Sequence, residues 1–228
     1  MNIHSHGFGM TIVSLSTGRR AADAERRDRI IEAAERAFVR NGFHAATMQH
    51  VAEEAGMSPG NLYRYFPSKE AIVEGLCEVD RGRRAGAFDA LADLLARNGD
   101  LTDAIRWGMR EHVLSKPPEK ARMIVEIWAE AGRNPRVAEI TQKLDADVLS
   151  GLERLTDAAK AAGAASPRLN SRFAARFFVT YVAGLFKRIA VEPGFNPNAE
   201  TDMAVRVFKA LFAGKLSDDP APGEEARQ

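Results

Sequence analysis

Residues 47–71, TMQHVAEEAGMSPGNLYRYFPSKEA, decide the fold of this 228-residue chain. Their pattern predicts two short helices joined by a tight turn, followed by the start of a third helix. Thr47 is a suitable N-cap for the first helix, and Gly56 can end it because glycine adopts a positive φ without steric cost. Ser58 is a suitable N-cap for the second helix, with Pro59 at the first position, where a missing N–H does no harm.

The second short helix has a small apolar side and a large polar side. Leu62 and Phe66 are expected to face the core, whereas the remaining positions expose backbone or hydrogen-bonding groups. A helix this short with so many outward donors is suited to contacting another molecule. We therefore interpret it as the recognition helix of a helix-turn-helix DNA-binding unit. Its outward positions are Pro59, Gly60, Asn61, Tyr63, Arg64 and Tyr65.

The composition is that of an ordinary globular protein, with 45% hydrophobic and 28% charged residues. The formal net charge of +1 does not by itself indicate nucleic acid binding, so any basic surface must come from the arrangement of charges in space. The single cysteine, Cys77, excludes an internal disulfide and fits a reducing, cytoplasmic setting. No apolar run approaches the roughly 20 residues needed to span a bilayer, so no membrane association is expected.

Every apolar stretch follows a helical period, and none alternates with the period of two that marks a strand. We therefore predict an all-α protein of about nine helices. A helix-turn-helix DNA-binding domain is expected at residues 21–67, with its bracing helix at residues 21–41. A helical ligand-binding and dimerisation domain is expected at residues 68–216. Residues 1–20 and 217–228 are expected to form a disordered leader and a disordered tail.

The stretch at residues 169–191 is apolar nearly all the way round. A helix with two apolar faces must bury both, one in its own core and one against a partner. We predict that this helix and the one at residues 198–214 form a four-helix interface in a homodimer. A helix buried centrally in a monomer is the alternative. The expected interface residues are Ala174, Phe178, Val182, Leu185, Ile189, Val207, Phe208 and Leu211.

Aromatic, sulfur-containing and polar side chains of the middle helices are candidates for a small-molecule site. Such sites are mostly apolar, with a few polar groups that fix the orientation of the ligand. Ordinary core packing is the competing interpretation for each of these side chains, including the histidine. The candidates are Trp107, Met109, His112, Met123, Trp128, Phe177 and Tyr181.

The sequence offers little support for an enzyme. It contains no Gly-rich phosphate loop, no HExxH motif, no cluster of Cys and His and no nucleophile elbow, so neither a cofactor nor a metal is expected. Two classes of function remain. One is a ligand-responsive DNA-binding regulator, and the other is a helical ligand-binding or interaction protein without sequence-specific DNA binding.

Residues 30–76 closely resemble the N-terminal domain of the TetR family of bacterial transcriptional regulators. The resemblance is specific because it rests on the order of many short motifs along three helices. These motifs are Phe38 followed by Asn41-Gly42-Phe43, then Thr47, Val51-Ala52, Ala55-Gly56, Ser58, Leu62-Tyr63-Arg64-Tyr65-Phe66 and Ser68-Lys69-Glu70.

The resemblance implies a role for individual residues at the DNA. Thr47 would contact a phosphate, with simple capping as the alternative, and Lys69 would anchor a second phosphate. Asn61 would pair with adenine, and Pro59 would pack on a thymine methyl group. Met48 replaces a polar residue that reads a base in some family members, which restricts it to apolar contact. The implied DNA-binding residues are Thr47, Met48, Ser58, Pro59, Gly60, Asn61, Tyr63, Arg64, Tyr65 and Lys69.

The resemblance also implies a mechanism. Members of the family bind palindromic operators as dimers, because two recognition helices must enter successive major grooves about 34–36 Å apart. A small-molecule effector, here expected to be largely apolar, enters the helical domain and shifts the helix that follows Ser68. The recognition helices then leave operator spacing, and repression is the usual outcome of binding without effector.

Overall fold

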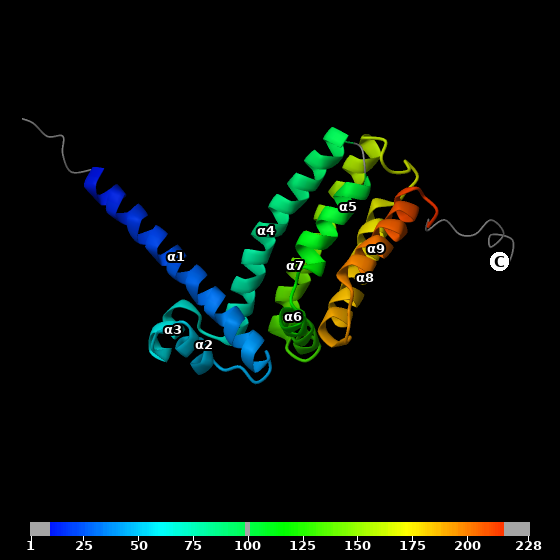
Figure 1. The fold of residues 1–228 in the computed structure, drawn as a ribbon. Helices are drawn as coiled ribbons and strands as arrows, with labels where there is room; N and C mark the ends of the chain where they lie inside the picture. Colours follow the sequence, from blue (N-terminus) through cyan, green and yellow to red (C-terminus); the bar gives the residue numbers. More distant parts are fainter. Residues whose placement is uncertain (1–9, 99–100, 217–228) are drawn as a thin grey trace, which may run out of the picture. The chain divides into compact units, whose positions relative to one another are not determined.

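The computed structural model describes residues 10–98 and 101–216, and no strand occurs in these ranges (Figure 1). The predicted all-α fold of nine α-helices is confirmed for this part of the chain. A π-helical turn, η1, continues the fifth helix. The elements are α1 (Met10–Asn41), α2 (Met48–Glu54), α3 (Pro59–Tyr65), α4 (Lys69–Asn98), α5 (Leu101–Met109), η1 (Arg110–Leu114), α6 (Pro118–Ala131), α7 (Pro135–Ala161), α8 (Ser171–Val191) and α9 (Pro197–Phe212).

The N-terminal helix is longer than predicted. Residues 10–20, which we expected to be disordered, are helical and form the beginning of α1. Residues 1–9 and 217–228, which hold the rest of the expected leader and the expected tail, lie outside the described residues. The chain divides into two compact units, Met1–Leu76 and Cys77–Gln228, later than the boundary that we expected at residue 68. The division falls inside α4, which is one continuous helix.

The core of the first unit forms where α1, α2, α3 and the start of α4 bury their apolar sides. Phe38, Leu62 and Phe66 are buried there, as the sequence predicts. Gly42 has a φ of 76°, and the chain after it turns back so that the Phe43 ring meets Phe38 edge-on at 5.2 Å between centroids. This plug at the end of α1 fixes the point from which α2 starts.

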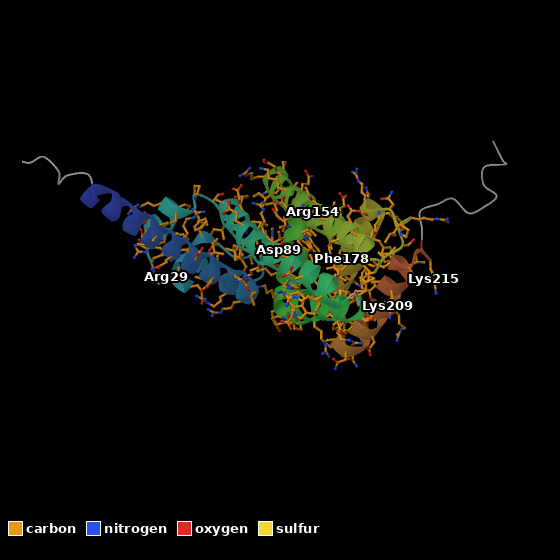
Figure 2. The ribbon with its side chains drawn as sticks, turned by 90° about the horizontal axis from the view of Figure 1, so that it is seen from above. Arg29, Asp89, Arg154, Phe178, Lys209 and Lys215 are labelled. Atoms are coloured by element: carbon orange, nitrogen blue, oxygen red, sulfur yellow. The ribbon has the colours of Figure 1, made fainter. Side chains whose placement is uncertain are left out.

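The second unit is a bundle in which α8 packs against α6 and α7, with ring contacts from α8 to α9. Its main core includes Met109, Leu185, Phe186, Phe208 and Leu211. Figure 2 shows Phe178 among the helices of this unit, whereas Lys209 and Lys215 lie at its outer edge. The apolar side of α8 that carries Phe178 therefore belongs to the interior of the single chain.

Two further properties of the described helices bear on function. None of them combines the length and the hydropathy that crossing a lipid bilayer requires. The single cysteine, Cys77, is half-buried on α4, and burial, together with the negative charge of Asp80, raises the pKa of its thiol to about 11. Cys77 is therefore a protonated thiol at neutral pH, as expected for a packing residue.

Candidate DNA interface and ligand cavity

The start of α2 is fixed by a reciprocal cap. Thr47 has an extended backbone, and its Oγ1 accepts a hydrogen bond from the His50 N–H at 3.3 Å. The N–H of Thr47 in turn donates to Nδ1 of His50 at 3.3 Å, so His50 takes the part usually played by Glu or Gln in a capping box. The Thr47 side chain is exposed, and its hydroxyl proton is not used by the cap. Thr47 can thus cap the helix and still donate to a phosphate.

The cap before α3 determines where the helix begins, and its fourth residue, Leu62, determines which side faces the core. Oγ of Ser58 accepts from the Asn61 N–H at 3.3 Å, and Pro59 occupies the first helical position. Leu62 is fully buried, which turns the opposite side of α3 outward. Tyr63 is 50% exposed, a large value for an aromatic side chain, and Arg64 is exposed beside it.

The polar side chains of α3 have no use within the fold. In the described parts of the chain, the side chains of Asn61, Tyr63 and Arg64 make no hydrogen bond or ion pair. Pro59 and Gly60 precede them on the half-turn that follows the cap. A base edge or phosphate could be bound by these groups without breaking an internal contact.

The far end of α3 is held by an arginine of α1. Nη1 of Arg27 donates to the Tyr65 carbonyl at 3.0 Å, and its guanidinium lies 4.4 Å from the centroid of the Phe66 ring. Arg27 therefore stabilises the C-terminal end of α3, where carbonyls lack helical partners. The Tyr65 side chain itself is half-buried.

The far end of α2 is held to α1 by a pair of arginines. Glu54 accepts from Nε of Arg36 at 2.8 Å and from Nη1 of Arg40 at 2.9 Å. The hydrogen bond from Arg36 is the main reason that the pKa of Glu54 lies below its usual value. Both helices of the motif are thus anchored at their C-terminal ends to α1.

The side chain of Lys69 makes hydrogen bonds within the first unit. Its Nζ donates to the carbonyls of Phe43 at 2.9 Å, His44 at 3.3 Å and Ala46 at 3.1 Å. These three bonds use all the donors of an ammonium group. Lys69 therefore holds the turn before Thr47, and its ammonium group would have to give up one of these bonds to contact a phosphate.

Three exposed arginines of the first unit make no ion pair with another described residue. They are Arg26 and Arg29 on α1 and Arg64 on α3. Figure 2 shows Arg29 on the surface of α1. Among the described side chains of this unit, these arginines could therefore bind a phosphate without losing an internal ion pair.

Most residues of the predicted dimer interface are buried within the single chain. Ala174, Leu185, Ile189, Phe208 and Leu211 are each at most 4% exposed within the single chain. Phe178 and Val182 are half-buried and face a cavity of the same unit, and only Val207 keeps partial exposure away from it.

The other stripe of α8 is only partly covered in the single chain: Phe173 and Phe177 pack against the edge of the core, Phe177 with its ring centroid 6.2 Å from that of Phe208. Phe173 and Phe177 are half-buried, with ring centroids 6.4 Å apart, and Thr180 and Gly184 continue the stripe as exposed positions. Gly184 has open space in front of it, because a Cβ built there would meet no atom within 4 Å.

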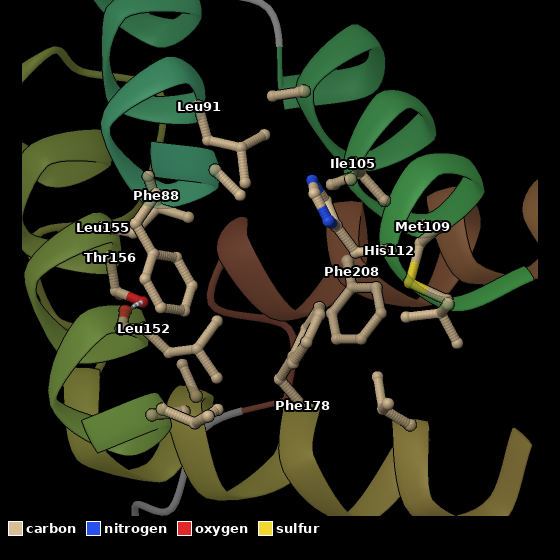
Figure 3. A pocket seen from close by; sticks show the side chains of 18 of the residues that line it. Phe88, Leu91, Ile105, Met109, His112, Leu152, Leu155, Thr156, Phe178 and Phe208 are labelled. Carbon is tan, nitrogen blue, oxygen red and sulfur yellow. Dashed lines mark hydrogen bonds between the residues drawn. The ribbon is translucent and has the colours of Figure 1, made fainter. Parts of the chain in front are cut away.

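The second unit encloses a cavity of about 120 Å³ between α4, α5, η1, α7, α8 and α9 (Figure 3). Most of its wall is aliphatic or aromatic. Gly151 of α7 makes room for one wall residue, since a Cβ at this position would overlap with the ring of Phe88. Labelled wall residues are Phe88, Leu91, Ile105, Met109, His112, Leu152, Leu155, Thr156, Phe178 and Phe208.

Few polar groups reach this cavity. Thr156 is occupied, because its hydroxyl donates to the Leu152 carbonyl at 2.8 Å, and Nε of Arg84 is bonded to Asp80. Nε2 of His112 is buried without a hydrogen-bond partner among the described residues, and its ring points into the cavity in Figure 3. Burial and then the charge of Lys116 lower the pKa of His112, so its imidazole is neutral at pH 7.

The structure separates the predicted ligand-site residues into two groups. Met109 and His112 line the cavity. Trp107 packs edge-on against His112 at 5.1 Å between centroids but lies outside the wall, as do Trp128, Met123, Phe177 and Tyr181.

Sequence reasoning missed the walls from α4 and α7. The packing of a small residue, Gly151, against a large one, Phe88, is the feature that indicates this part of the wall. The two residues are far apart in the sequence, so their contact is visible only in the fold. Across the described residues, no group of three or more His, Cys, Asp or Glu side chains is placed to hold a metal ion.

Comparison with known proteins identifies the family. Residues 30–76 match the model of the tetR family of bacterial regulatory proteins, and residues 113–216 match that of the C-terminal domain of BetI-type transcriptional repressors. The HTH-type transcriptional regulator UidR of Escherichia coli K12 is 30% identical over 171 residues, which cover 73% of this chain and 82% of UidR. This chain belongs to the TetR family of transcriptional regulators. The helix-turn-helix that was inferred from residues 47–71 is thus the family's DNA-binding motif.

Other relatives agree with this assignment. The repressor KstR of Rhodococcus jostii is 29% identical to this TetR-family protein over 142 residues, covering 60% of this chain and 65% of KstR. The structure of Salmonella enterica GusR superposes with a TM-score of 0.67 at 26% identity, covering 82% of this chain and 95% of GusR. FadR of Bacillus subtilis, solved in complex with stearoyl-CoA, shares the fold with a TM-score of 0.65 at 17% identity, covering 82% of this chain and 97% of FadR.

Proposed function

We propose that this TetR-family regulator is a cytoplasmic, dimeric repressor that leaves a palindromic operator when a small molecule occupies the cavity. One observation carries the proposal: α4 is a single helix that begins at Lys69, beneath the turn before α2, and supplies Phe88 and Leu91 to the cavity wall. A ligand that displaces the distal part of α4 would act on the same helix that contributes its first residues to the DNA-binding unit.

The DNA contacts follow from the free groups of α2 and α3. Asn61 is the proposed adenine reader, with Pro59 and Gly60 allowing close approach to the base edges. Arg64 is proposed to bind a guanine or a phosphate, and Tyr63 a phosphate. Thr47, Ser58 and the half-buried Met48 and Tyr65 complete the surface through the ends of the two helices.

The dimer is proposed to form through the partly covered stripe of α8 together with α9. Phe173, Phe177, Thr180 and Gly184 supply the α8 side, and Val207 is the residue of the original prediction that still fits. An isologous pairing of two helices from each copy would cover the partly exposed rings, and Gly184 would let the helices approach closely.

The cavity is proposed to hold the effector. A cavity of roughly 150 Å³ accommodates benzene in another protein, so the volume of about 120 Å³ suits a small molecule. The long acyl chain of the FadR ligand does not suit a space of this size. An effector must bind the DNA-incompetent state much more tightly, about 10⁴-fold for a shift from 1:99 to 99:1, so weak stabilisers will not release the operator.

Fluorescence anisotropy with DNA from the region upstream of the protein's own gene tests the proposal. We expect tight binding to one palindromic segment, with a steep salt dependence and a stoichiometry of two chains or a multiple of two. Binding that is equally tight to every sequence would refute sequence-specific operator recognition and would leave a helical ligand-binding protein as the function.

A further inference from the structure

We propose that the cavity binds a compact, uncharged, single-ring molecule whose one hydroxyl group bonds to Nε2 of His112, that is, a phenol or a cyclic alcohol of similar size. The inference rests on the proposed effector role of the cavity and names the chemical class of the effector. It starts from one feature of the structure: an apolar space into which the buried Nε2 of His112 is directed without a hydrogen-bond partner among the described residues.

The volume and the apolar walls of the cavity indicate the size and the ring of the ligand. The space of about 120 Å³ lies below the roughly 150 Å³ that hold a benzene ring elsewhere, so one ring fills it. Phe88, Leu91, Phe178 and Phe208 form the walls around this space (Figure 3), and aromatic walls favour edge-to-face packing with a ring.

The neutral imidazole of His112 indicates which polar group the ligand carries. A neutral imidazole has one donor nitrogen and one acceptor nitrogen, and a hydroxyl group can both donate and accept. A hydroxyl therefore satisfies Nε2 in either tautomer, whereas a ketone would satisfy only one. Burial and the positive charge of Lys116 lower the pKa of His112, which keeps the imidazole neutral and the cavity free of a fixed charge there.

A charged ligand does not fit. Among the described residues, Arg84 is the one charged side chain in the cavity wall, and its charge is already paired with that of Asp80. Thr156 has committed its proton to the Leu152 carbonyl. A carboxylate would therefore lose its hydration without gaining a free counter-charge, which is costly in an apolar site.

The local backbone supports a binding role for His112. His112 lies in η1, where the Ser115 N–H donates to the Arg110 carbonyl at 3.0 Å in the i to i+5 pattern of a π turn. Such turns are rare and occur mostly as single turns at functional sites. The unpartnered Nε2 and the π turn are two separate observations that both point to His112 as a binding residue.

Isothermal titration calorimetry on the full-length protein without DNA tests the assignment with three probes: phenol, toluene and benzoate. Toluene keeps the ring and nearly the shape of phenol but has no hydroxyl, and benzoate adds a charge. We expect phenol to bind and benzoate not to bind. In His112→Leu, the ratio of phenol affinity to toluene affinity should fall about tenfold, because the phenol hydroxyl is left without a partner.

Two control variants locate the site. Tyr181→Phe removes a hydroxyl oxygen that, like Nε2 of His112, is buried without a hydrogen-bond partner among the described residues but does not belong to the cavity wall. It should leave both affinities unchanged. Gly151→Ala should push the Phe88 ring into the cavity and weaken phenol and toluene together, with their ratio preserved. The ¹⁵N resonance of Nε2 of His112 in the wild-type protein should shift with phenol and not with toluene.

The results distinguish a failure of the proposed ligand class from a failure of the proposed effector role. An equal phenol-to-toluene ratio in wild type and His112→Leu, or tighter binding of benzoate than of phenol, would overturn the assignment. Unchanged phenol binding by Gly151→Ala would place phenol outside this cavity and would overturn it as well. If phenol binds as expected but leaves operator affinity unchanged, the ligand class stands and the effector role of the cavity is refuted.

Discussion

Nζ of Lys69 donates to the Phe43 carbonyl at 2.9 Å and lies 4.5 Å from the centroid of the Phe43 ring. One cation thus satisfies the backbone and covers the ring of the residue that plugs the end of α1. The same ammonium donates to the carbonyls of His44 and Ala46, just before the cap of α2. The first residue of α4 therefore fixes the approach to Thr47, where α2 begins.

Replacing this cation should disturb the fold before it disturbs DNA charge pairing. We expect Lys69→Met to lower the free energy of unfolding by about 2 kcal/mol, the usual loss when a charged hydrogen-bonding group is removed. The salt dependence of operator binding should keep its slope, whereas Arg64→Met should lower that slope by about 1. Denaturant titration and anisotropy at several salt concentrations measure both effects. The reverse pattern would return Lys69 to the phosphate contact.

Asn61→Ala should relax base preference. The side-chain amide of Asn61 has no partner among the described residues, so its removal should affect a base contact and leave the fold intact. We expect a loss of about 1–3 kcal/mol on the operator and little change on random DNA. Competition anisotropy with single-base variants of the operator will show which position loses its preference. Equal weakening on operator and random DNA would contradict a base-reading role.

Gly75 of α4 lies against the side chain of Ile31 on α1. A Cβ at Gly75 would overlap with Cδ1 of the buried Ile31 and crowd the Phe66 ring. Gly75→Ala should therefore destabilise the protein by about 1–3 kcal/mol through overpacking. Gly82→Ala on the same helix meets no atom within 4 Å and should instead stabilise it by about 0.5–1 kcal/mol. Thermal unfolding of both variants will decide, and equal melting temperatures would contradict the close approach.

The local features of the motif were predictable from the sequence because neighbours along the chain determine them. Thr47 and Ser58 cap their helices, and Gly56 has a φ of 63°, as the residue types require. The burial of Leu62 and Phe66 follows from helical spacing in the same way. Caps, positive-φ turns and apolar periods need no knowledge of distant partners.

Features set by distant contacts were not predictable. The acceptors of Lys69 come from residues more than 20 positions earlier in the chain, so its hydrogen bonds to the turn before Thr47 could not be read from the sequence. On α8, Phe177 and Phe178 are both apolar, and the helical period cannot tell which of two adjacent stripes faces the chain's own core. The cavity depends on the fit of Phe88 against Gly151, a property of packed helices that no single stretch of sequence contains.

The partly covered stripe of α8 gives a direct test of the dimer. Thr180→Glu and Gly184→Glu should each convert the dimer to monomer, because a charge would be buried at a close helix contact. Their folds should persist, since both positions are exposed in the single chain. Gln142→Glu, on the exposed side of α7, is the matched control and should stay dimeric. Light scattering after size exclusion reports the mass, and a persistent dimer would place the interface elsewhere.

Protonation of His112 should destabilise the protein at mildly acidic pH. Burial and then Lys116 and Arg84 lower its pKa from 6.5, against smaller opposing effects of Glu111 and Asp80. Because the folded pKa lies below the unfolded one, the unfolded chain binds the proton first, so stability is lost as pH falls below about 6.5. His112→Leu should remove this part of the pH dependence. Melting temperatures from pH 8 to 5 measure it, and identical curves for both proteins would contradict the assignment.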